Sequence, residues 1–157
     1  MRSRRLSIAL AGLLLTANFL LKNELPGTLG KRPRQPQWSD LEFQMRNWWH
    51  FTWISGDHIV EQHVHNLDVV NWAMQAHPTR CRGMGGRQVR TDPKFGHIFD
   101  HHAVQYQYEG GAYCFSESRQ IDGCANDVSE HVYGADGEAH MGGSFRITER
   151  DRERRLV

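Results

Sequence analysis

The sequence predicts an α+β fold in which helices pack on one face of a largely antiparallel, open sheet. Two observations lead to this prediction. Before Pro78, apolar residues recur at spacings of three and four, as on one side of a helix. After Pro78 the pattern alternates with a period of two and is interrupted by glycine-containing turns. Strands that follow one another through short turns pair antiparallel, so the helices that precede them are expected to cover one face of the sheet.

The longest helical pattern runs from Ser55 to Trp72. Ser55 or Asp57 can cap its start, because a short side-chain oxygen accepts a hydrogen bond from free backbone amides. Pro78 is expected to stop it, because proline has no amide hydrogen. The predicted docking face consists of Val60, Val64, Leu67, Val70 and Met74.

A shorter helix is predicted from Leu41 to Trp48 or Trp49, with Ser39 or Asp40 as its cap. The segment 38–53 that contains it is dense in aromatic residues. Two interpretations stay open for these rings, which are packing in the core and an aromatic platform for carbohydrate.

The second half of the chain reads as strands joined by turns. Residues 109–111 (Glu-Gly-Gly) and 134–137 (Gly-Ala-Asp-Gly) have the composition of hairpin turns. The tail, 146–157, is rich in arginine and acids, and it is interpreted as a solvated helix end or a disordered segment. The predicted strands are 80–90, 99–108, 112–120, 130–133 and 138–141.

The first residues allow two interpretations. Met1–Arg5 is basic and precedes an apolar run, 6–21, as in a signal peptide, but no clean cleavage site follows. The run is shorter than the roughly 20 residues of a membrane-spanning helix. It is therefore either an export signal or anchor, or a helix or strand folded onto the body, and both a cytoplasmic and an exported or membrane-anchored location stay open. The predicted organisation is 1–31 as apolar segment and connector, 32–145 as the domain, and 146–157 as the charged tail.

Composition narrows the function classes. The 157 residues suit one domain, and a net charge of +1 argues against a nucleic-acid partner. Cys81, Cys114 and Cys124 are odd in number and lack Cys-x-x-Cys spacing, so neither a disulfide framework nor a zinc knuckle is indicated. The ten histidines keep a zinc or iron protein open as an alternative, but no ligand spacing supports it, and no metal site is predicted.

A second, titratable stripe follows the helical pattern, one residue out of phase with the apolar face. It consists of Asp57, Glu61, His65 and Asp68. Acids and histidines on a helix are often a solvated surface. At i and i+4, however, Glu61 and His65 are close enough to share a hydrogen bond, so they are a candidate general acid/base pair.

Six segments together resemble the C-terminal domain of the Gfo/Idh/MocA oxidoreductases, the family of glucose–fructose oxidoreductase and inositol dehydrogenase. The resemblance covers roughly residues 32–141, and the long segment at its centre is the most specific part. The segments are 32–36, 46–48, 56–68, 85–90, 97–101 and 129–134.

The resemblance implies a function. The family pairs a dinucleotide-binding Rossmann domain with a sheet domain that binds substrate and builds oligomer contacts. Its motif of an acid, a histidine four residues later and an Asp three beyond falls on Glu61, His65 and Asp68. His65 is then the acid/base residue at the hydroxyl group of a sugar or polyol. Glu61 stands where many members have Asp. The residues expected to bind substrate are Arg32, Arg34, Trp53, Asp57 and His97.

The chain also departs from the family. No Gly-x-Gly-x-x-Gly follows a strand pattern, and the family's Glu-Lys-Pro segment is absent. NAD or NADP is therefore implied for the family, but no tight binding is expected from this chain alone, which resembles a fragment that needs a Rossmann-domain partner. A homo-oligomer is expected. Two alternatives stay open: part of an NAD-dependent glycosidase, and a non-catalytic carbohydrate-binding or dimerisation module.

Overall fold

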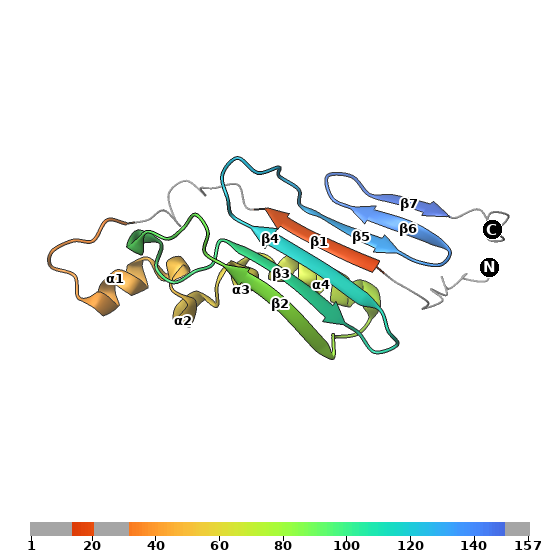
Figure 1. Ribbon diagram of the computed structural model, residues 1–157, viewed down its shortest axis with the longest axis horizontal. Helices are drawn as coiled ribbons and strands as arrows, with labels where there is room; N and C mark the ends of the chain where they lie inside the picture. The colour runs from red at the N-terminus through yellow and green to blue at the C-terminus, as the bar shows by residue number, and fades with distance from the viewer. Residues whose placement is uncertain (1–13, 21–31, 150–157) are drawn as a thin grey trace, which may run out of the picture.

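A computed structural model describes residues 14–20 and 32–149, which form one seven-stranded sheet with short helices against it (Figure 1). The strand order is β2-β3-β4-β1-β5-β6-β7. Only β1 and β4 pair in parallel, and the other neighbouring strands pair antiparallel. The predicted α+β class with a largely antiparallel, open sheet is confirmed. The strands are β1 (Leu14–Leu20), β2 (Arg80–Gly86), β3 (His101–Gln107), β4 (Tyr113–Arg119), β5 (Ser129–Tyr133), β6 (Gly137–Met141) and β7 (Arg146–Glu149).

The helices lie on one face of this sheet and at one end of it, and the other face is uncovered in Figure 1. α4 lies against β1 and β5. The predicted short helix is present as α1, and Ser39 caps it by accepting a hydrogen bond from the Glu42 amide at 3.1 Å. The helical elements are α1 (Asp40–Arg46), η1 (Trp48–His50), α2 (Thr52–Ser55), α3 (His58–Glu61), α4 (Val64–Met74) and η2 (Pro93–Phe95).

The single helix predicted from Ser55 to Trp72 is wrong, because the segment forms α2, α3 and α4 in succession. Gly56 has a φ of 71° and Asp57 a φ of 74°, which is left-handed backbone that no α-helix can continue through. Asp57 then caps α3, as expected, by accepting from the His58 amide. A second break at Gln62, with φ −125° and ψ −49°, separates α3 from α4.

The predicted docking face is also wrong over its first half. Val60 and Val64 are 53% and 42% exposed, whereas Val70 is fully buried. His63 and Asn66 are buried instead. Because of the breaks, α4 does not continue one straight helix, and its inward residues begin at His63, one position before Val64.

Two predicted ends differ from the structure. α4 ends at Met74, where Gln75 adopts a left-handed conformation, and not at Pro78. Residues 146–149, predicted as part of a solvated or disordered tail, form β7, which pairs antiparallel with β6. Residues 150–157 lie outside the described residues. The strands predicted before the tail all occur, with ends shifted by a few residues.

The N-terminal apolar run contributes a central strand. β1 pairs in parallel with β4 and antiparallel with β5, so over residues 14–20 the run is a strand folded onto the body. The rest of the run and the connector up to residue 31 lie outside the described residues. No helix in the described part of the chain is long and apolar enough to cross a membrane.

The apolar core lies under the second half of α4. Its buried members are Val70, Tyr108, Ala112 and Cys114. Burial raises the pKa of the Cys114 thiol to about 12, so this cysteine is an inert packing residue. The Tyr108 hydroxyl donates to Asn71 Oδ1 at 2.6 Å, which satisfies the one polar atom that the ring brings into the core.

Asp100 organises the loop that follows β2. Its side chain is fully buried, and Oδ2 accepts hydrogen bonds from the amides of Gln88, Val89 and Arg90 at 2.7–2.9 Å. Burial alone would raise the pKa of Asp100, but these amides and the His101 ring lower it to about 2. A carboxylate with three donors therefore fixes the entry to β3.

We expect Asp100→Asn to lower the free energy of unfolding by about 2 kcal/mol, because hydrogen bonds to a charged acceptor contribute about 1.5–3 kcal/mol. Urea denaturation at neutral pH measures the change. The exposed Asp122→Asn is the matched control and should change stability by less than about 0.5 kcal/mol. Equal losses in the two variants would contradict the role assigned to Asp100.

Deleting residues 1–20 should cause aggregation, because it removes the strand between β4 and β5 and leaves two unpaired edges. Light scattering of the purified chain measures this. Deleting residues 1–13 keeps β1 whole and is the control. A monodisperse 1–20 deletion with unchanged circular dichroism would show that β1 is dispensable.

Candidate functional site

A polar layer separates the first part of the helical segment from the sheet. Along β4, the buried side chains alternate, and the inward positions after Cys114 are Ser116 and Ser118. The strand register places His102 of β3 directly beside Ser118. Small hydroxyl residues on the sheet thus leave room for imidazole rings from the helices.

Asp57 is the centre of this layer. Its Oδ1 accepts from the His58 amide at 2.6 Å and lies 3.0 Å from His58 Nδ1. Its Oδ2 accepts from the Phe99 amide at 2.7 Å. Although burial would raise its pKa, the nearby imidazoles of His102 and His58 and the hydrogen bonds from the two amides hold the pKa of Asp57 well below its usual range. The side chain is therefore an ionised carboxylate inside the protein.

Two imidazoles flank this carboxylate. The His58 ring is buried, and its Nε2 lies 3.0 Å from Ser118 Oγ. The His102 ring lies with its centroid 4.5 Å from that of His58, and its Nε2 is 3.7 Å from Asp57 Oδ1. The Phe99 ring stacks on the His102 ring, with the two centroids 5.4 Å apart.

α4 continues the polar layer toward the apolar core. His63 Nε2 forms a hydrogen bond with Ser116 Oγ, and Asn66 donates to Glu130 of β5. Burial, together with smaller coulombic contributions from His58 and His102, lowers the pKa of His63 to about 4. His63 is therefore neutral at physiological pH.

The predicted catalytic residues lie on the opposite, outward side. His65 and Asp68 are exposed on α4, and Glu61 is half-buried at the end of α3. Because the helix is broken between Glu61 and His65, the two do not share one continuous i,i+4 face. Among the described residues, no hydrogen bond joins His65 to Glu61 or Asp68. Their catalytic roles stay a prediction.

The predicted substrate-binding residues are dispersed. Trp53 is 58% exposed, and its Nε1 donates to Gln44. Arg34 pairs with Asp40 at 2.6 Å, and the Arg32 amide donates to Asn47.

The other two predicted substrate-binding residues differ in their surroundings. His97 is exposed and packs edge-on against Phe51 at 5.2 Å. Asp57 is buried, and both of its oxygens are bonded inside the protein, so the structure does not bring the five residues together.

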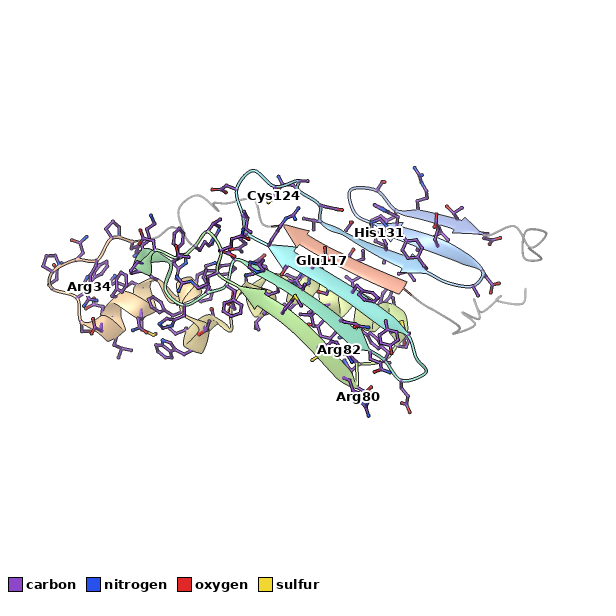
Figure 2. All side chains as sticks on the ribbon, viewed as in Figure 1. Arg34, Arg80, Arg82, Glu117, Cys124 and His131 are labelled. Carbon is purple, nitrogen blue, oxygen red and sulfur yellow. The ribbon has the colours of Figure 1, made fainter. Side chains whose placement is uncertain are left out.

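A second histidine pair lies far from these residues. Figure 2 shows Arg34 beside α1, at the opposite end of the molecule from His131 on β5. His131 Nδ1 lies 3.2 Å from His140 Nδ1, and His131 Nε2 lies 3.2 Å from Ser129 Oγ. The two rings, with Glu138 and Arg146, line a pocket of about 330 Å³ over β5, β6 and β7.

The spacing of the valines predicts the wrong inward side for the helical segment, so the burial of two histidines was not predicted. His58 and His63 do not belong to the predicted docking face. The signal that points to them is on β4, where a cysteine and two serines alternate at 114, 116 and 118. Small polar residues on the covered face of a strand indicate that polar partners from the helices reach it.

His63 makes stability depend on pH. Its pKa is about 4 in the folded chain and about 6.5 when unfolded, so between these values the unfolded state binds more protons. The free energy of unfolding should therefore fall as pH is lowered from 6.5 to 4, by at most roughly 3 kcal/mol from this residue.

His63→Gln keeps a partner for Ser116 but cannot titrate. The stability of the variant relative to the wild type should rise as pH falls through this window, as measured by urea denaturation. His77→Gln, at an exposed position, should show no such change. Parallel pH profiles for the wild type and His63→Gln would contradict the assignment.

Comparison with known proteins gives a match in structure alone. No family model matches the sequence, and no curated protein matches it. Among solved structures, the WlbA dehydrogenase from Bordetella pertussis, in complex with NADH and UDP-GlcNAcA, has a TM-score of 0.59 at 14% identity, over 89% of this chain and 37% of its own. A putative oxidoreductase from Thermotoga maritima has a TM-score of 0.61 at 12% identity, over 88% and 37%.

A levoglucosan dehydrogenase, in complex with NADH and levoglucosan, has a TM-score of 0.55 at 13% identity, over 88% of this chain and 39% of its own. The chain thus spans less than two fifths of the length of each of these structures. At such identities the similarity establishes the fold. The chain has the fold of the C-terminal domain of Gfo/Idh/MocA-type dehydrogenases, as the sequence motifs predict.

Proposed function

We propose that this chain is the substrate-binding half of a nicotinamide-dependent oxidoreductase that acts on a sugar or polyol. It is inactive alone and acts with a Rossmann domain that holds the cofactor. His65 is the acid/base residue, and Glu61 and Asp68 position it.

The outward side of α4 carries this proposal. Val64, His65, Asp68 and Trp72 fall within an arc of roughly 100° on the helix, opposite the buried His63 and Val70. Val64 is 42% and Trp72 73% exposed. Apolar side chains that surround titratable ones on an uncovered face are typical of a surface that another domain closes. A closed site of this kind excludes water from the group that transfers the proton.

His65 has the chemistry for the step assigned to it. A neutral imidazole accepts the proton of a substrate hydroxyl group as the carbon that bears it is oxidised to a carbonyl. Asp68, one turn further along the same helix, is close enough to stabilise the imidazolium that forms. This chain supplies the proton transfer and the positioning of substrate.

The described residues do not fit a dinucleotide. A pyrophosphate site needs a close glycine turn between a strand and the N-terminus of the following helix. In the described chain, α4 is the longest helix, and it follows α3 through Gln62 and His63 without a glycine. NAD or NADP is therefore assigned to the partner domain.

The structural relatives support the substrate class. The Bordetella pertussis structure contains UDP-GlcNAcA, and the levoglucosan dehydrogenase contains levoglucosan, each together with NADH. Both are sugars or sugar derivatives. Exposed Trp53 and His97 are available for stacking and hydrogen bonding to such a ligand, whereas Asp57 acts from inside the fold.

The uncovered face of the sheet is available to a second copy of the chain. Met84 is 78% exposed and Phe115 39% exposed on this face. Homo-oligomer formation through this face stays a prediction.

The test is a fusion of residues 1–157, which keeps β1, to the cofactor-binding part of the Bordetella pertussis relative, assayed with UDP-GlcNAcA and NAD. His65→Ala should lower turnover by about 10²–10⁴-fold, the contribution of a positioned acid/base, and weaken substrate binding less.

His77→Ala changes an exposed histidine just beyond α4 and is the matched control. Equal losses from His65→Ala and His77→Ala would contradict the proposal, as would full turnover in His65→Ala. If the fusion shows no turnover, addition of UDP-GlcNAcA to the chain should still shift the NMR signals of the His65 ring and leave those of His77 unchanged.

A further inference from the structure

We propose that Asp57, His58 and His102 form a binding site for one divalent first-row transition-metal ion. The proposal does not depend on the oxidoreductase function. It concerns the inward side of the helical segment, under α3, whereas His65 lies on the outward side of α4.

The distances between the three side chains fit a metal site. Asp57 Oδ1 lies 3.0 Å from His58 Nδ1 and 3.7 Å from His102 Nε2, and the three ligand atoms are all within 4.8 Å of one another. Metal–ligand distances of about 2.0–2.2 Å place two tetrahedral ligand atoms roughly 3.3 Å apart. Small rotations of the side chains therefore bring all three atoms to coordination distance of one point.

Residues next to the three ligands, on the sheet and in the loop before β3, fix the orientation of the ligand side chains. Ser118 Oγ lies 3.0 Å from His58 Nε2, and the register makes Ser118 the direct neighbour of His102. When His58 Nε2–H donates to Ser118, Nδ1 is unprotonated and its lone pair points toward Asp57. The Phe99 amide orients the other oxygen of the carboxylate. Such outer partners are a regular part of metal sites, because they fix the tautomer and orientation of each ligand.

The charge of the cluster favours a cation. The Asp57 carboxylate is 6% exposed, and its Oδ1 lies near a ring nitrogen of both His58 and His102. His102 Nε2 is buried, and it has no hydrogen-bond partner among the described residues. A divalent ion at this point would neutralise the buried carboxylate and give His102 Nε2 a partner.

The donor set selects the kind of ion. Two imidazoles and one carboxylate suit zinc or ferrous iron, whereas calcium and magnesium prefer oxygen ligands only. Three protein ligands leave at least one position for water. The Phe99 ring is 38% exposed and stacks on the His102 ring.

The test uses the full chain, stripped with a chelator and then titrated with ZnCl₂ against a fluorescent zinc indicator. One equivalent should bind, and CoCl₂ should give visible absorption bands of a low-coordinate nitrogen–oxygen site. His102→Gln should weaken zinc binding at least 10-fold, because it removes a ligand.

Two control variants address the other histidines. His101→Gln changes the neighbouring residue, which binds Asp100 and points to the other face of the sheet. His140→Gln removes half of the His131–His140 pair. Both should bind zinc as the wild type does. Unchanged binding in His102→Gln, or a loss in either control as large as in His102→Gln, would overturn the proposal.

Hydrogen exchange of the wild-type chain gives a test that no folding defect affects. Zinc should slow amide exchange in peptides that cover 55–62 and 99–104 and leave 129–141 unchanged. Protection confined to 129–141, or no protection at all with one equivalent of zinc bound, would show that the ion binds elsewhere.

Discussion

The buried carboxylate of Asp57 is the interaction on which the arrangement of helices and sheet depends. It sits at a backbone position with a φ of 74°, which a residue other than glycine adopts at a cost of about 1–3 kcal/mol. The carboxylate offsets this cost by capping α3 with one oxygen and by binding the Phe99 amide, just before β3, with the other. The break between α2 and α3 and the entry to the sheet are thereby fixed by one side chain.

The interface between the helical segment and the sheet changes gradually from polar to apolar along the chain. At α3, the His58 ring contacts Ser118 of β4, and at the start of α4 the His63 ring contacts Ser116. The end of α4 packs on apolar residues, with Val70 in the same cluster as Cys114. Imidazole–hydroxyl pairs need defined geometry, whereas apolar contacts are tolerant of small shifts. The position of the helical segment is thus specified at its polar end and stabilised mainly at its apolar end. This division leaves the outward side of α4 free for the chemistry that we assign to it.

The sequence predicted the fold class and the strands because alternation and turn residues are local signals. It did not predict the breaks at Gly56 and Gln62, since each depends on contacts with distant strands: Asp57 binds Phe99, and His63 binds Ser116. An error in helix phase placed Val60 and Val64, which are exposed, on the inward side in place of the buried His58 and His63. The outward stripe of His65 and Asp68 was correctly placed on a helix, but the cluster around Asp57 came from residues that are far apart in the chain. His102 had no local pattern that distinguished it from His101.

The place of β1 in the sheet has a consequence for how the chain folds. Leu14 pairs with Tyr113 on one side and with Tyr133 on the other, so β1 has no partner until β4 and β5, which follow it in the sequence, have been synthesised. In the β2–β3–β4 and β5–β6–β7 units, strands that are neighbours in the sequence pair with each other, and all but the β2–β3 connection, 87–100, are short, so each unit can form from local contacts. β1 then joins them by closing the largest loops in the molecule, and such non-local pairing is slow. During synthesis the chain therefore passes through a state in which both three-stranded units are formed and the apolar β1 segment is still unpaired. A chaperone that binds extended apolar chain can bind β1 in this state.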